Sequence, residues 1–148
     1  MYSILLIIHS LLRYALVFSA LFAIYRAITG MQSKTPFTAL DNKASVFLVM
    51  FMHTQLLVGF LLYFVFSPFA DIPLDMKNPV IRFWKMEHLA LMIIAVALFQ
   101  VGRIASKKAA TDLLKHKKAA IFYTIGFVIL MAGIPWPFSK VARAFLPF

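Results

Sequence analysis

Four long apolar runs limit what this chain can fold into more than any other feature of its sequence. They cover residues 2–28, 44–66, 80–101 and 117–134. A helix of about 20 mostly apolar residues crosses the hydrocarbon core of a bilayer. Only 14% of the residues are charged, whereas soluble domains carry about 25%. We therefore expect an integral membrane protein, with residues 1–148 forming one membrane domain.

Short connections separate the four runs. Gly30, Pro68 and Pro135 follow the first, second and fourth runs, and Pro79 precedes the third. Glycine and proline commonly mark helix boundaries, and short connections make consecutive helices antiparallel neighbours. The sequence therefore predicts an all-α fold, an up-down-up-down four-helix transmembrane bundle.

Lysine and arginine are distributed unevenly over the connections. The first and third connections hold Arg26, Lys34, Lys43, Arg103, Lys107, Lys108, Lys115, Lys117 and Lys118. The second connection and the C-terminal tail hold fewer, namely Lys77, Arg82, Lys85, Lys140 and Arg143, and three carboxylates accompany them. Because basic loops stay in the cytoplasm, we expect an N-out and C-out orientation.

Composition and motifs exclude several classes of function. The net charge of +10 does not indicate nucleic acid binding, because the basic residues flank apolar runs and anchor helices to lipid headgroups. The absence of cysteine excludes disulfides, thiolate zinc sites and iron–sulfur clusters. No glycine-rich phosphate loop, nucleophile elbow or HExxH motif occurs, so a hydrolase is not expected.

Two histidines within apolar runs carry the main functional hypothesis. His9 shares a stripe at three-and-four spacing with Arg13, Leu16, Ala20, Ala23 and Ala27, and His88 begins a similar stripe. Each lies about seven or eight residues from the outer start of its helix, hence roughly 10 Å deep. Because the first and third helices of such a bundle are diagonal, these imidazoles can approach opposite faces of one macrocycle. Bis-histidine haem ligation is therefore the leading interpretation.

Three alternatives remain for this pair. Both histidines can be neutral residues that pack helices through hydrogen bonds. They can also bind another metal, or contact a quinone. An ionisable residue at membrane depth indicates a functional site by default.

The other two histidines are interpreted differently. His53 is expected near the midplane, and four roles are open to it. It can join His9 and His88 in a three-nitrogen metal site, or replace one of them as a haem ligand. It can also contact a quinone or make an interhelical hydrogen bond. His116 stands within a lysine-rich stretch and is expected to be a solvated loop residue. Gln55 and Gly59 are expected on a face away from His53, where they pack helices or face a partner subunit.

Arg13 lies one turn deeper than His9 and needs an anionic partner. Glu87 is the acidic residue best placed to enter the bundle, so we predict an Arg13–Glu87 ion pair. A haem propionate is the alternative partner of Arg13. Glu87 is also a candidate proton carrier for quinol chemistry.

Several short motifs carry a family resemblance. They are His9-Ser-Leu-Leu-Arg13-Tyr14, His53-Thr-Gln55-Leu-Leu-Val-Gly59, Glu87-His88, Gly102-Arg103 and Ile134-Pro-Trp-Pro137. With these motifs the chain resembles small four-helix bacterial membrane proteins catalogued as cytochrome b or cytochrome b-like. The resemblance implies haem b, held by His9 and His88 with His53 as the third ligand candidate, and the bacterial inner membrane.

The predicted function is a membrane b-type cytochrome with one haem in the outer half of the bundle. Bis-histidine iron has no open position, so we expect an electron-transfer component between a quinol and an outer-side acceptor. One haem cannot bridge the membrane alone, which makes a quinone or a membrane or periplasmic partner subunit necessary. The alternatives are a cofactor-free accessory subunit of a larger complex and a metal-binding protein built on His9, His53 and His88.

Overall fold

The computed structural model describes residues 1–141 and 143–145. Over these residues the chain is helical, with four long helices and no strand. Its elements are α1 (Tyr2–Ser33), α2 (Ala39–Leu61), the π-helical turn η1 (Leu62–Phe66), α3 (Pro79–Arg82), the π-helical turn η2 (Phe83–Glu87), α4 (His88–Lys107) and α5 (Asp112–Gly133). The predicted all-α class is confirmed for the described residues.

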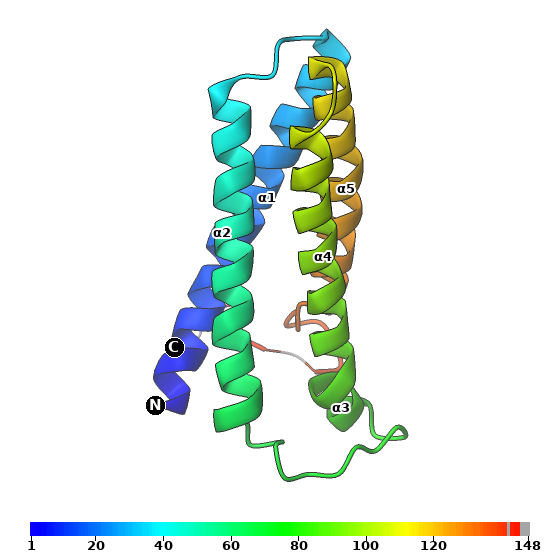
Figure 1. The fold of residues 1–148 in the computed structure, drawn as a ribbon. Coiled ribbons are helices and arrows are strands. Elements are labelled where there is room, and N and C mark those ends of the chain that lie inside the picture. The colour runs from blue at the N-terminus through cyan, green and yellow to red at the C-terminus, as the bar shows by residue number, and fades with distance from the viewer. Residues whose placement is uncertain (142, 146–148) are drawn as a thin grey trace.

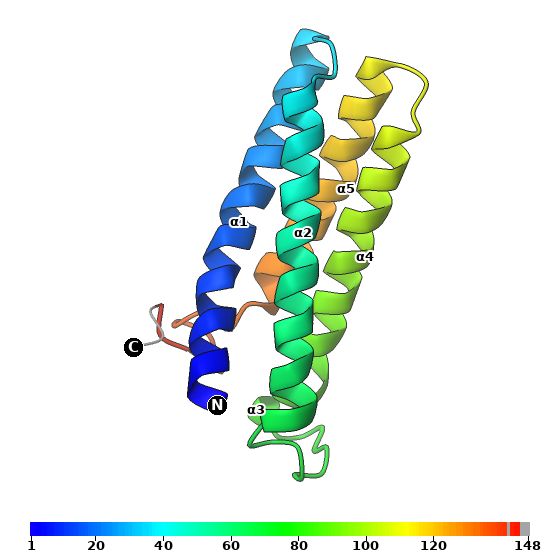
Figure 2. The same ribbon diagram turned by 60° about the vertical axis from the view of Figure 1, so that its left-hand side comes forward.

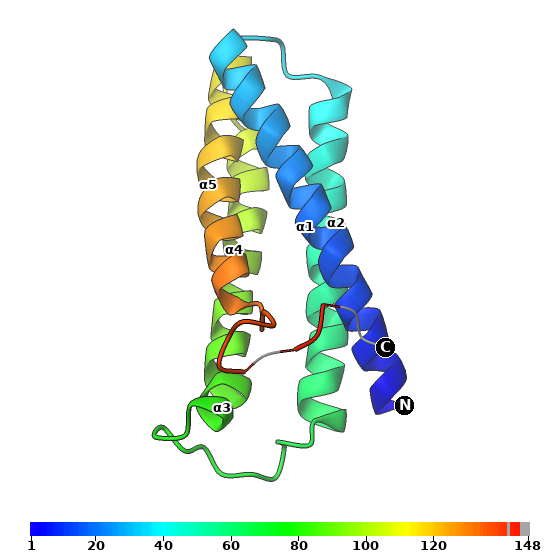
Figure 3. The ribbon, with the colours of Figure 1, turned by 180° about the vertical axis from the view of Figure 1, so that it is seen from behind.

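Consecutive long helices run in opposite directions (Figure 1). Helix α1 packs against α2 and α5, and α4 packs against the same two helices. Helices α1 and α4 are therefore diagonal, as Figure 2 shows. Seen from behind, α1 crosses the others obliquely, and the chain after α5 runs across toward it (Figure 3).

The two ends of this bundle differ in character. Connections 34–38 and 108–111 meet at one end, which we name the basic end because most of the lysines lie there. Helix α1 begins, and α5 finishes, toward the opposite end, where α3 and η2 also lie. We name this opposite end the histidine end, because His9 and His88 are near it.

Small residues let the helices approach closely. Along α1 the predicted stripe is buried, comprising Arg13, Leu16, Ala20, Ala23 and Ala27. Leu48, Phe99 and Tyr123 fill the space opposite this stripe, each with at most 1% of its surface exposed. Small interface residues are typical of helices that associate in lipid, where no hydrophobic effect drives them together.

Large apolar side chains remain exposed on the outside of the bundle. Phe18 and Phe64 are 70% and 65% exposed. Soluble proteins rarely expose large apolar surfaces to water. Three segments are long and apolar enough to cross a membrane: Tyr2–Ser33, Ala39–Phe66 and Pro79–Lys107. These features indicate a multi-pass membrane protein. Helix α5 does not meet the same criterion because its first two turns carry Asp112, Lys115, Lys117 and Lys118.

Most helices are longer than the apolar runs predicted. Helix α1 passes through Gly30 and ends where Lys34 adopts a left-handed conformation with φ of 52°. Helix α2 begins earlier, at a capping box in which Thr38 and Asp41 satisfy each other's backbone groups. Helix α5 begins at Asp112 because Thr111 caps it. Hydropathy marks the part of a helix that suits lipid, whereas capping residues set where it ends.

The third apolar run has an irregular start. The Asn78 side chain accepts hydrogen bonds from the amides of Val80 and Ile81, and Pro79 occupies the first helical position. The π-helical turn η2 follows and leads directly into His88. Such turns insert an extra residue into a helix and often occur at functional sites. Because η2 ends immediately before His88, it determines the direction in which the His88 side chain points from α4.

Candidate functional site

His9 and His88 face each other across the bundle. Their ring centroids are 6.4 Å apart and their planes make an angle of 69°. His9 belongs to the third turn of α1, and His88 is the first residue of α4. The structure thus brings together, from diagonal helices, the two histidines that the sequence singled out.

A hydrogen bond to α5 orients the His88 ring. Its Nδ1 lies 2.7 Å from the carbonyl oxygen of Gly133. A carbonyl oxygen only accepts, so Nδ1 is the donor in this bond, and in the neutral ring Nε2 is then the nitrogen with the lone pair. The rings of Phe83 and Trp84, both from η2, each lie 5.7 Å from the His88 ring. This arrangement has the form of a metal-ligating histidine, whose second nitrogen commonly donates to a carbonyl.

Helix α2 supports His9 with two residues one turn apart. Gln55 donates from Nε2 to the carbonyl oxygen of His9 at 3.0 Å. A methyl group added to Gly59 would lie 3.2 Å from the Cε1 atom of His9. Gly59 therefore leaves the room in which the His9 ring sits, and Gln55 fixes the backbone that carries it.

A cavity of about 140 Å³ lies beside the two histidines. Residues of α1, α2, α4 and both π-helical turns line it, together with Pro135 and Arg143 after α5. Four buried side-chain polar atoms have no hydrogen-bond partner among the described residues, and three belong to this lining: His9 Nδ1, Arg13 Nε and Gln55 Oε1. Buried polar groups are rarely left unpaired in native proteins. Three such atoms therefore face one cavity, where a polar ligand could pair with them.

Arg13 reaches the C-terminal tail rather than a carboxylate. Its Nη2 donates to the Tyr14 hydroxyl at 3.0 Å and to the carbonyl oxygen of Phe145 at 3.1 Å. The Tyr14 hydroxyl also donates to that carbonyl. The Arg143 guanidinium lies 4.9 Å from the centre of the Trp84 ring. The tail therefore brings a second cation to the cavity and covers one side of it.

The predicted Arg13–Glu87 pair is not formed. Glu87 Oε1 instead accepts from Nε of Arg82, one helical turn away on the same segment. Both side chains are about one-third exposed, and Glu87 is not part of the cavity lining. The π-helical turn η2 brings Glu87 next to Arg82, which becomes its partner instead of Arg13. The hydropathy of the sequence gives no sign of this turn.

His53 lies apart from the other two. Its ring is exposed on α2, and Nδ1 bonds to the carbonyl oxygen of Val49 in its own helix. Within residues 1–141 and 143–145, no three histidine, aspartate or glutamate side chains gather where they could hold a metal ion. The three-histidine site is therefore not formed, because His53 occupies a different face of α2 from Gln55 and Gly59.

His116 is not the solvated loop residue that its lysine neighbours suggested. It lies in α5 with 1% of its surface exposed. Its Nε2 lies 3.2 Å from the carbonyl oxygen of Thr35, and its ring is 5.1 Å from the Phe37 ring. The helix begins before the lysines and turns His116 inward, while Lys117 stays exposed.

Several cavity residues were missed at the sequence level. Gln55 and Gly59 were expected to pack helices or face a partner, and Tyr63 and Arg143 were not singled out. Gln55, Gly59 and Tyr63 recur every four residues, so their spacing could have placed them on one face. Arg143 follows the last helix, and no periodic signal could have placed it.

No protein-family model, no curated protein sequence and no solved structure matches this chain. The functional argument therefore depends on the geometry of the site.

Proposed function

We propose that this protein binds one haem b between His9 and His88 and serves as an electron-transfer component in a membrane. The observation that carries the proposal is the facing pair of imidazoles beside a cavity with three unpaired polar atoms. The electron donor in this proposal is a quinol, and the acceptor is on the outer side of the membrane. Quinone and a membrane or periplasmic redox subunit are the proposed partners.

The spacing of the two rings supports an iron ligand pair. Imidazole nitrogens bind metals at about 2 Å, so two opposed ligands of one ion have ring centres roughly 6 Å apart. The observed separation is 6.4 Å. In its neutral form His88 offers the Nε2 lone pair, because Nδ1 donates to Gly133, and His9 Nδ1 has no hydrogen-bond partner among the described residues.

The size of the cavity sets a condition on the proposal. Its volume of about 140 Å³ is below the ~300 Å³ at which sites for small organic molecules usually begin. A macrocycle therefore enters only if lining side chains move apart. The described part of the C-terminal tail contacts the helices in this region through Arg13, Tyr14 and Trp84. Its displacement is the change that we expect on loading.

The other lining residues have specific roles in this proposal. Arg13 and Arg143 supply positive charge for the propionate carboxylates, because guanidinium groups pair well with carboxylates. Gly59 leaves room beside His9, and Gln55 holds the His9 backbone. Bound haem supplies one-electron redox chemistry, and two histidine ligands favour electron transfer over oxygen activation.

The uneven charge supports an orientation. The basic end carries the connections 34–38 and 108–111, and each has lysines within it and after it. The positive-inside tendency places that end in the cytoplasm and the histidine end outside. The site then lies in the outer half of a four-helix bundle in the bacterial inner membrane, with α5 as the fourth transmembrane helix.

Absorption spectroscopy of the purified protein tests the proposal. Protein isolated from cells supplied with haem should show a b-type α band after reduction. His9→Ala and His88→Ala should each lose that band, because one axial ligand is removed. His53→Ala is the matched control, since His53 is exposed and does not line the cavity, and it should keep the band. Full-length, folded wild-type protein without the band would refute haem binding.

A second function rests on the hydrogen bonds of the same residues. His88 links α4 to α5 through Gly133, and Gln55 links α2 to α1 through His9. These bonds and the small cavity favour a cofactor-free accessory subunit in which the histidines hold helices together. In that case His88→Ala would lower the unfolding temperature, and stoichiometric partner subunits would co-purify without bound metal.

A further inference from the structure

A second cavity lies at the basic end, away from the histidines. Its volume is about 310 Å³, and residues of α2, α4 and α5 line it. Three of its lining side chains are cationic: Arg103, Lys107 and Lys115. Asn42, Ser45 and Ser106 add polar groups. The proposed electron-transfer function makes no use of this cavity.

Carboxylates do little to neutralise these cations. Lys115 Nζ is 3.8 Å from Asp112 Oδ1, a long contact with a side chain that is 48% exposed. Asp41, the nearest other acid along α2, is already bonded to Arg26 at 2.8 Å. Arg103 Nη1 donates to the neutral Asn42 Oδ1 at 3.3 Å. The pocket therefore retains an excess of positive charge.

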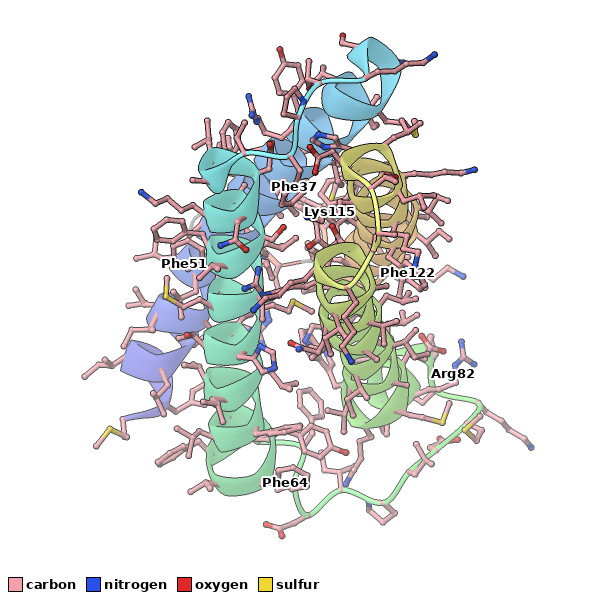
Figure 4. The ribbon with its side chains drawn as sticks, turned by 45° about the horizontal axis from the view of Figure 1, so that its top comes forward. Phe37, Phe51, Phe64, Arg82, Lys115 and Phe122 are labelled. Atoms are coloured by element: carbon pink, nitrogen blue, oxygen red, sulfur yellow. The ribbon has the colours of Figure 1, made fainter. Side chains whose placement is uncertain are left out.

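The three cationic residues of the pocket come from two helices, α4 and α5. Figure 4 looks onto this end, with Phe37 and Lys115 labelled beside each other near the start of α2. The Lys115 ammonium is 5.7 Å from the centre of the Phe37 ring. Arg103 and Lys107 come from α4, one turn apart. An anion in the pocket is thus approached by cations from two helices.

The start of α2 adds a favourable dipole. Thr38, the N-cap, and Ala39, the first helical residue, both line the pocket. The capping box already pairs the amides of Thr38 and Asp41, but the helix dipole still favours negative charge at this end. Together with the three cations, this end of the 23-residue helix suits a phosphate group.

We propose that this pocket binds a phosphate group, and that its source is the headgroup of an anionic phospholipid. Apolar side chains continue from the pocket along the outer surface. Val46 lies one turn from Asn42 and is 40% exposed, and Ile104 lies one turn from Lys107 and is 43% exposed. A lipid whose phosphate occupied the pocket would lay its acyl chains over these residues. Basic pockets between membrane helices bind anionic headgroups in this way.

Native mass spectrometry of the full-length protein in detergent tests the proposal. The probes are phosphatidylglycerol, phosphatidylcholine and inorganic phosphate, each titrated separately. Arg103→Gln with Lys107→Gln should weaken phosphatidylglycerol binding about 25-fold, since each basic residue contributes about fivefold. Lys115→Gln alone should weaken it about fivefold. Lys117→Gln with Lys118→Gln removes the same charge outside the pocket and should leave binding within about twofold of the wild type, because salt screens charges that do not contact the bound phosphate.

The outcomes separate a pocket from a general charge effect. Equal losses in the two double variants would overturn the proposal, as would an unchanged affinity in the pocket variants. Phosphatidylglycerol binding no tighter than phosphatidylcholine, with inorganic phosphate still bound through Arg103 and Lys107, would assign the site to a soluble phosphate compound. Circular dichroism of each variant confirms that the helices are intact.

Discussion

At the scale of single residues, Gly30 and His116 pack so closely that no side chain fits at position 30. A Cβ atom there would lie 2.3 Å from Cε1 of the His116 ring. Gly30→Ala should therefore lower the free energy of unfolding by about 1–3 kcal/mol, the usual cost of overpacking. Thermal unfolding in detergent, followed by circular dichroism, measures the change.

A matched glycine serves as the control. Gly126 is also buried in a helix, but an added Cβ would meet its nearest atom, Cε1 of Phe99, at 3.3 Å. Gly126→Ala should therefore be nearly neutral. His116→Ala should relieve the strain, so the double variant should be more stable than the sum of the two single changes. Strict additivity would show that the ring does not exclude the methyl group.

Residue-level prediction from the sequence depended on which signal was used. His9 and His88 were expected to face each other because both positions lay on inward stripes, and their ring centroids do lie 6.4 Å apart. His116 was misplaced because its lysine neighbours were read as a polar stretch. It belongs to an inward stripe with Ala119, Ala120 and Tyr123 at three, four and seven residues, a pattern that was present in the sequence.

At the scale of elements, Lys85 connects η2 to the connection that follows η1. Its Nζ donates to the carbonyl oxygens of Phe69, Ala70 and Ile72 at 3.0, 3.0 and 2.6 Å. Lys85→Met keeps the length of the side chain but removes all three bonds. Because hydrogen bonds to charged groups contribute about 2 kcal/mol each, the connection should open at least about thirtyfold more often.

Limited chymotrypsin digestion detects that opening, since Phe69 provides a cleavage site within the connection. The Lys85→Met variant should be cut there much faster than the wild type. Lys77→Met is the control, because Lys77 is exposed in the same connection and does not bond to the three carbonyls that Lys85 holds. Equal cleavage of the two variants would mean that Lys85 does not hold the connection.

The π-helical turns mark the limit of prediction at this scale. Apolar content placed the helices near residues 62–66 and 83–87 but gave no sign of a change in hydrogen-bond pattern. That change has consequences for the site, because η2 directs Phe83 and Trp84 against His88. It also brings Glu87 to Arg82, which removes Glu87 from the bundle interior. Such turns occur mostly as single-turn bulges inside α-helices, so the apolar content of the run does not distinguish them.

At the scale of the whole molecule, the proposed orientation places connection 108–111 in the cytoplasm and connection 67–78 outside. The chain contains no cysteine, so one introduced thiol reports one position. Asp75→Cys and Ala110→Cys both lie at exposed positions, and neither residue lines a cavity. The pair therefore samples the two ends of the bundle with little disturbance.

A membrane-impermeant maleimide applied to intact bacterial cells with a permeabilised outer membrane should label Asp75→Cys and leave Ala110→Cys unmodified. After lysis both should react. The reason is the surplus of lysine and arginine at the basic end, which resists transfer across the inner membrane. The reverse pattern would place the histidine end in the cytoplasm and would exclude an outer-side electron acceptor. The reverse labelling pattern would not contradict haem binding, because that proposal depends on His9 and His88 facing each other and not on the orientation of the bundle.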